Sequence, residues 1–178
     1  MWQLAAAMIE IALRRRGPES LPDSTFLVLF LLVLDAALDV VASLLIGDIT
    51  GLGFLRFAAS TSLIFAFVFA VLSFFKLERR YRQTMSALLG AFIVIGIAFL
   101  PIAVVGVAMG LKLEEPPFLW FGLVFELWAI FIAASVLARS LSQPFVVGLM
   151  FAILLVVTLE SLSNLLAPAI PPVSMEAS

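Results

Sequence analysis

The chain has 178 residues, of which 64% are hydrophobic and 12% are charged, and its formal net charge is −2. With 17 phenylalanines and a mean hydropathy of +1.24, it is too apolar for a soluble globular domain, in which about half of the residues are apolar. Cysteine and histidine are both absent, which excludes disulfides, thiol or imidazole catalysis and the usual zinc and haem ligands. The composition predicts an integral membrane protein, and the negative net charge argues against nucleic-acid binding.

The first segment, residues 1–16, is predicted to be an amphipathic helix. Its polar arc includes Glu10 and Arg14, whose spacing suits an i, i+4 ion pair. The opposite face is apolar: Trp2, Leu4, Met8, Ile9 and Leu13. This pattern favours a helix lying in the cytoplasmic interface, with three arginines against lipid phosphates: Arg14, Arg15 and Arg16. The alternative is an anchor that packs on the rest of the fold.

Residues 17–25 are predicted to be a linker. Gly17-Pro18 ends the first helix, and Pro22-Asp23-Ser24 supplies a break followed by the N-cap of the next helix.

Five apolar runs follow, each long enough to cross a hydrocarbon core, which takes about 20 helical residues. They are Phe26–Ile46, Phe54–Phe75, Met85–Met109, Phe118–Ala138 and Pro144 to about Leu166. We therefore expect an all-α polytopic membrane protein: five transmembrane helices over residues 26–166, the N-terminal interfacial helix, and a short exoplasmic tail over residues 167–178.

Lysine and arginine are unevenly distributed between the two sides of this arrangement. Arg56 and Lys112 fall on one side, and the other eight fall on the opposite side: Arg14, Arg15, Arg16, Lys76, Arg79, Arg80, Arg82 and Arg139. Because positively charged loops stay in the cytoplasm, the N-terminus is predicted to be cytoplasmic. A missed or additional span would mix the two groups, so the charges support the helix count independently of hydropathy.

The connection between the second and third spans is the second basic element. Its four positive charges flank Tyr81 and are candidates for contact with anionic lipid headgroups or an acidic partner: Lys76, Arg79, Arg80 and Arg82. The simpler interpretation is that they only enforce topology.

Acidic residues inside the apolar runs are the other candidates. Carboxylates at such depth cost ~2.5 to 3.5 kcal/mol each on insertion scales and often mark function. From the rise of a helix, Asp35, Asp39 and Glu126 lie roughly 13, roughly 20 and roughly 18 Å from the cytoplasmic boundary, depths at which the three carboxylates can meet in mid-membrane. Glu160 lies nearer the outer boundary, where snorkelling to the headgroups is the simpler interpretation.

Small residues share the helix faces of these acids and allow close packing in lipid. We therefore expect spans one and four to face each other, or a common partner, with Arg56 as the candidate counter-ion. One interpretation is a buried hydrogen-bonded knot that ties the spans together. The other is a proton or cation site.

Catalysis is not expected. The chain has no Gly-x-Ser-x-Gly elbow and no phosphate-binding glycine loop, and Asp35 and Asp39 lack neighbouring metal ligands. No catalytic residue, metal site or cofactor motif is predicted.

The span number, the short length and the Pro-containing lead-in Pro18-Glu19-Ser20-Leu21-Pro22 make the chain similar to the bacterial branch of the Yip1-type membrane proteins. The Asp-Leu-Tyr-Gly-Pro signature of eukaryotic members is absent, so their small-GTPase partnership is not implied. The resemblance implies a non-catalytic scaffold or accessory protein of a bacterial inner membrane, which binds a membrane or protein partner or forms a homo-oligomer. The alternative is a small transporter or channel component with a buried carboxylate cation or proton site.

Overall fold

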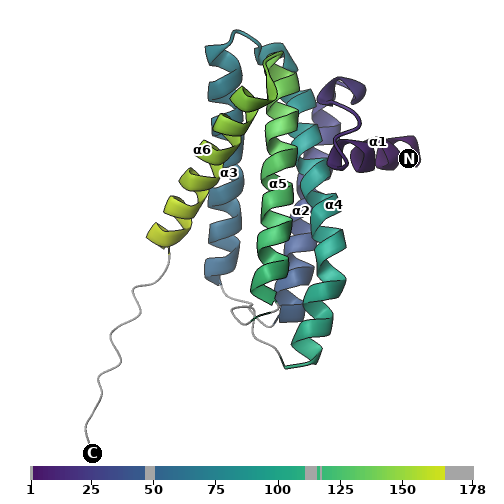
Figure 1. The fold of residues 1–178 in the computed structure, drawn as a ribbon, viewed down its shortest axis with the longest axis vertical. Helices are drawn as coiled ribbons and strands as arrows, with labels where there is room; N and C mark the ends of the chain where they lie inside the picture. The colour runs from purple at the N-terminus through teal and green to yellow at the C-terminus, as the bar shows by residue number, and fades with distance from the viewer. Residues whose placement is uncertain (1, 47–50, 111–115, 117, 167–178) are drawn as a thin grey trace, which may run out of the picture.

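The computed structural model describes residues 2–46, 51–110, 116 and 118–166, and no strand occurs among them. The helical elements follow in chain order (Figure 1): α1 (Trp2–Ala12), η1 (Pro18–Ser20), α2 (Thr25–Ile46), α3 (Gly51–Phe74), η2 (Glu78–Arg80), α4 (Tyr81–Ala108), α5 (Phe118–Leu141) and α6 (Phe145–Leu166). Within this part of the chain, α2 to α6 are the five helices long and apolar enough to cross a membrane. The all-α fold with five spans and a short N-terminal helix is therefore confirmed.

The third span begins earlier than hydropathy indicates. It was expected from Met85, but α4 already begins at Tyr81. Arg82 therefore belongs to the helix, and the connection to α3 is reduced to a short segment that includes η2. Apolar runs mark the bilayer-crossing part of a helix, whereas polar residues that form helices well extend it beyond that part. The expected tail, residues 167–178, and Lys112 lie outside the described residues.

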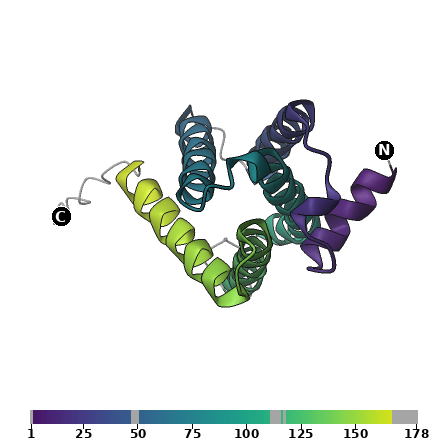
Figure 2. The ribbon, with the colours of Figure 1, turned by 90° about the horizontal axis from the view of Figure 1, so that it is seen from above.

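The spans form an up-and-down bundle in which α4 is central. Figure 1 shows α2 to α5 running along the long axis, α6 running obliquely to them, and α1 lying across the bundle near one end. Seen from above in Figure 2, α2 and α5 lie on opposite sides of α4 and both pack on it, while α6 packs closely on α5 and also contacts α3. We call the end formed by residues 14–25, 75–84 and 139–145 the basic end. The most deeply buried part of α4 adjoins it, over Thr84 to Ala91.

The contact between α5 and α6 depends on a glycine. A Cβ atom at Gly148 would lie 2.7 Å from the Cβ and backbone N of Ala138, and closer still to the carbonyl oxygen of Ala134. Only a residue without a side chain allows the two backbones to approach this far. Gly122, which shares a face with Glu126, has open space around its Cβ position, so it serves no such approach.

Three connections at the basic end share one form of helix termination. Arg14, Lys76 and Ser142 have φ values of 61, 58 and 54°, in the left-handed region. Each is followed by a backbone N–H that donates to a carbonyl five residues earlier, as in Leu77 to Leu72 at 2.8 Å. These are Schellman motifs built without glycine, and the left-handed conformation costs an L-residue about 1–2 kcal/mol.

The N-terminal helix packs on the bundle more than its hydrophobic pattern indicates. Its buried residues contact α4 and α5: Ala7, Met8, Ile11 and Ala12. The Met8 side chain fills the space beside Gly90, and the Trp128 indole N–H donates to the carbonyl of Ala12 at 3.1 Å. A second apolar stripe stays exposed and includes Trp2, at 83% relative exposure. The helix therefore has the packing of the alternative interpretation, an anchor on the fold, together with an apolar face available to lipid.

The expected pair of Glu10 with Arg14 is wrong. Because α1 ends at Ala12, Arg14 leaves the helix, and Glu10 forms an ion pair with Arg16 instead.

Candidate functional site

Asp35 and Asp39 open into a cavity of about 340 Å³ between α2, α3 and α4. Asp35 is half-buried and Asp39 is exposed. The hydroxyls of Ser60 and Thr61 on α3 also line the cavity, whose remaining lining is mostly apolar. The pair is one helical turn apart, so both carboxyl groups reach the same space, as their spacing predicts.

Glu126 lies on the other side of α4. Its cavity, of about 360 Å³, is formed between α4 and α5. Phe92, Gly96 and Phe99 of α4 line both cavities and separate Glu126 from the two aspartates. Of the two arrangements left open by the sequence, spans one and four thus share a neighbour rather than face each other. The idea that three carboxylates meet in one place is wrong, because matched depth does not fix position around the bundle.

The hydrogen-bonded knot is likewise not formed. No hydrogen bond or ion pair joins Asp35, Asp39 or Glu126 to another described residue, and none joins Arg56 to a described carboxylate. Glu160 is exposed in the C-terminal part of α6, which begins at the basic end and runs away from it. No group of three or more acidic residues within the described ranges could hold a metal ion.

The basic end, by contrast, is a connected polar structure. Arg80 donates through Nη1 to the carbonyl of Ser140 at 2.9 Å and to the hydroxyl of Ser142 at 2.8 Å. The start of α4 is thereby fixed to the connection between α5 and α6. Charge-assisted bonds of this kind are the stronger class of hydrogen bond, so they hold the guanidinium in one position.

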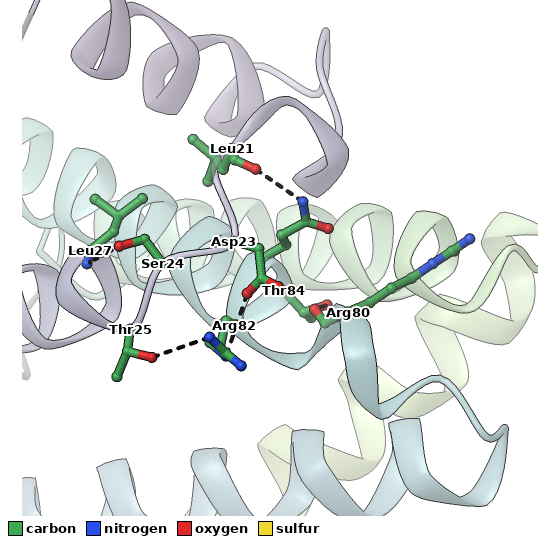
Figure 3. A network of polar contacts seen from close by, with 9 residues as sticks. Leu21, Asp23, Ser24, Thr25, Leu27, Arg80, Arg82 and Thr84 are labelled. Carbon is green, nitrogen blue, oxygen red and sulfur yellow. Dashed lines mark hydrogen bonds and ion pairs between the residues drawn. The ribbon is translucent and has the colours of Figure 1, made fainter.

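A second group of contacts fixes the linker to the same helix. Arg82 lies 3.4 Å from a carboxylate oxygen of Asp23 and donates to the hydroxyl of Thr25, while Gln83 donates to the carbonyl of Leu21 at 3.1 Å. Figure 3 shows Arg82 turned towards Asp23 and Thr25, and Arg80 extending away from them. Ser24 accepts a hydrogen bond from the N–H of Leu27, as an N-cap does, which confirms the predicted cap.

Arg139, which the sequence suggested only as a topology signal, connects the end of α5 to the segment that follows α1. Its guanidinium donates to the carbonyl of Arg14 at 3.2 Å, and Nη1 lies 3.9 Å from Glu19 Oε1. The Arg14 guanidinium lies 4.7 Å from the ring centroid of Phe145, a cation–π contact. Sequence spacing gives no signal for such contacts, because the partners are more than a hundred residues apart.

The remaining basic residues are more open. Arg15, Lys76 and Arg79 are exposed and make no side-chain hydrogen bond or ion pair with the described residues. Of the seven basic residues predicted to contact lipid headgroups or a partner, three fix the fold, namely Arg14, Arg80 and Arg82, one pairs with Glu10, and the other three have no such contact with the described residues.

A comparison of the chain with protein-family models, with curated proteins and with solved structures finds no match.

Proposed function

We propose that the protein is a non-catalytic scaffold or accessory protein of a bacterial inner membrane, of the Yip1-like type, and that its basic end faces the cytoplasm and binds a membrane or protein partner. The apolar surfaces of its five spans contact the lipid bilayer. The eight-to-two distribution of lysine and arginine supports the orientation.

The ordered basic end is the observation that carries the proposal. Segments distant in sequence are fixed there by arginine side chains, so the surface has a defined shape. Arg79 and Lys76 are exposed on it and have no partner among the described residues. A rigid scaffold with free cationic donors suits recognition of acidic groups, because little ordering is needed when the partner binds.

The second candidate, a transporter or channel component, is favoured by the cavity beside Asp35 and Asp39. Two acids without an ion pair or hydrogen bond to the described residues lie there beside Ser60 and Thr61, and ionisable groups inside a span suggest an ion or proton site. Glu126 lies on the far side of α4, which argues against a shared pathway for all three acids.

Reconstitution in liposomes that contain a pH-sensitive dye separates the two candidates. A scaffold gives no proton flux under an imposed gradient, and Asp35→Asn, Asp39→Asn and Glu126→Gln remain folded with unchanged stability. The scaffold would be refuted if the wild-type protein conducts protons, Asp35→Asn abolishes this flux and Glu126→Gln retains it. That result would establish the cavity between α2, α3 and α4 as the ion site.

Partner binding has its own test. A photo-crosslinking residue at Arg79 should give a discrete crosslinked species in cells, whereas the same residue at the exposed Met150 of α6 should crosslink to lipid. Equal patterns at the two positions would contradict a partner-binding basic end.

A further inference from the structure

A third cavity, of about 360 Å³, opens at the basic end. It lies between the linker, the start of α4 and the connection between α5 and α6. Two arginines line it, Arg80 and Arg139, together with Glu19 and the hydroxyls of Thr84 and Ser140. All but one of its lining residues are polar or charged, with two arginines against one glutamate, whereas the two cavities beside α4 are lined mostly by apolar residues and carry only acidic charges.

Arg80 retains donors after its structural bonds are made. A guanidinium has five N–H groups, and the contacts with Ser140 and Ser142 all use Nη1. The N–H groups on Nη2 and Nε have no partner among the described residues. The arginine is therefore fixed by one edge and has free donors on the others.

Arg139 is held in a similar way from the opposite side. Its Nη2 donates to the carbonyl of Arg14, while Nη1 is 3.9 Å from Glu19, beyond hydrogen-bond length. The Glu19 side chain is 69% exposed and folds back over Gly17, where a Cβ atom would overlap its carboxyl group. The chain thus places its own carboxylate at the edge of the cavity without forming a close ion pair.

The two buried hydroxyls add a donor. Thr84 lies 2.8 Å from both the carbonyl of Arg80 and the hydroxyl of Ser140, although it has a single proton to donate. When Thr84 donates to Ser140, the proton of Ser140 is free to point towards a ligand. Both residues are almost fully buried, so this donor is shielded from bulk solvent.

We propose that this cavity binds a phosphate group, carried either by the headgroup of an anionic lipid or by a soluble phosphate compound, and that Glu19 competes with it. The site rests on the proposed binding role of the basic end and names its ligand class. Arg80 at the start of α4 and Arg139 at the end of α5 both line the cavity, and guanidinium groups bind phosphate oxygens through paired N–H donors. The cavity lies at the ends of the spans, at the level of lipid headgroups, and has the volume of a small-ligand pocket.

The test uses the full chain in nanodiscs of phosphatidylcholine, with phosphatidic acid as the lipid probe and inorganic phosphate as the soluble one. Oleate serves as an anionic amphiphile without phosphate. Binding is read by native mass spectrometry for lipid and by tryptophan fluorescence for phosphate. If inorganic phosphate cannot displace bound phosphatidic acid, the ligand is a lipid. If inorganic phosphate displaces it, the ligand is a soluble phosphate compound. Both results support the site.

Three variants separate the cavity from surface charge. Arg139→Gln should weaken binding of phosphate or phosphatidic acid about tenfold, as expected for loss of one charge-assisted hydrogen bond. Arg15→Gln removes the same charge from an exposed side chain outside the cavity lining and should change binding less than about twofold. Glu19→Gln should tighten binding about twofold to fivefold, because it removes an exposed competing charge.

Equal weakening by Arg139→Gln and Arg15→Gln, oleate binding as tight as phosphatidic acid, or no tightening by Glu19→Gln would overturn the site. Glu19 is exposed, so its variant keeps the test valid even if Arg139→Gln does not fold. Proton flux in liposomes would refute the proposed scaffold but would leave the expected effects of the three variants on phosphate binding unchanged. Absence of both phosphate binding and proton flux would refute only the phosphate site.

Discussion

Replacing Gly148 by alanine should weaken the packing of α6 on α5. The new Cβ atom would lie 2.7 Å from two atoms of Ala138, and ordinary contact begins near 3.4 Å, so the helices must separate by about 0.7 Å or more. The contacts are with backbone atoms and with the Cβ of Ala138, none of which can rotate away. The cost of overpacking, about 1–3 kcal/mol, should therefore lie near the upper end of its range.

Gly122→Ala is the matched control, since nothing lies within 4 Å of its Cβ position. Alanine is a better helix former than glycine by about 0.5–1 kcal/mol, and this gain applies at both positions. Gly148→Ala should then lower the free energy of unfolding by about 2 kcal/mol in net terms, while Gly122→Ala should leave it unchanged or slightly raised.

The assay is unfolding of the purified protein in mild-detergent micelles by titration with sodium dodecyl sulfate, followed by circular dichroism and tryptophan fluorescence. If Gly148→Ala proves as stable as Gly122→Ala, the close approach of α5 and α6 is refuted.

Two further substitutions test the ends of the helices. Trp128→Phe removes the hydrogen bond to Ala12 and should increase the rate of amide hydrogen exchange over residues 2–13 about fivefold, as expected for a bond of about 1 kcal/mol. Trp120→Phe, at an exposed site, should leave this rate unchanged. Equal effects of the two substitutions would contradict the docking of α1 through Trp128. Lys76→Gly should raise the free energy of unfolding by about 1 kcal/mol relative to Lys76→Ala, since glycine alone adopts the left-handed conformation without cost, and no difference in the same titration would exclude strain there.

Local features of the fold could be predicted from the sequence. The five spans follow from apolar length, and the cap at Ser24 follows from residue type at a helix start. These properties depend on a few neighbouring residues, so a single sequence contains them.

The arrangement of the spans around α4 could not be predicted. In lipid, helix faces towards neighbours and faces towards acyl chains are both apolar, so hydropathy does not distinguish them. The depth estimate placed Asp35 and Glu126 at similar levels, but it could not show that they lie on opposite sides of α4. The small-residue spacings Gly148 with Ala152, and Ala134 with Ala138, were the available signal for the α5–α6 contact.

The cavity at the basic end was also beyond sequence reasoning. Arg80 and Arg139 are far apart in the chain, and each was interpreted from its charge alone. Unlike the other described basic residues, these two arginines donate to backbone carbonyls of distant segments, which hold the guanidinium groups at the cavity. Arg79, adjacent to Arg80, has the same charge and none of these contacts.

The most direct measurement is thiol labelling from the two sides of the membrane, because the chain has no cysteine of its own. Glu78→Cys places one thiol in η2 at the basic end, and Ser174→Cys places one in the C-terminal tail. With an impermeant maleimide on bacterial spheroplasts, the proposed orientation predicts labelling of Ser174→Cys before lysis and of Glu78→Cys only after it. Labelling of Glu78→Cys in intact spheroplasts, or of both variants from the same side, would contradict a five-span protein with a cytoplasmic basic end.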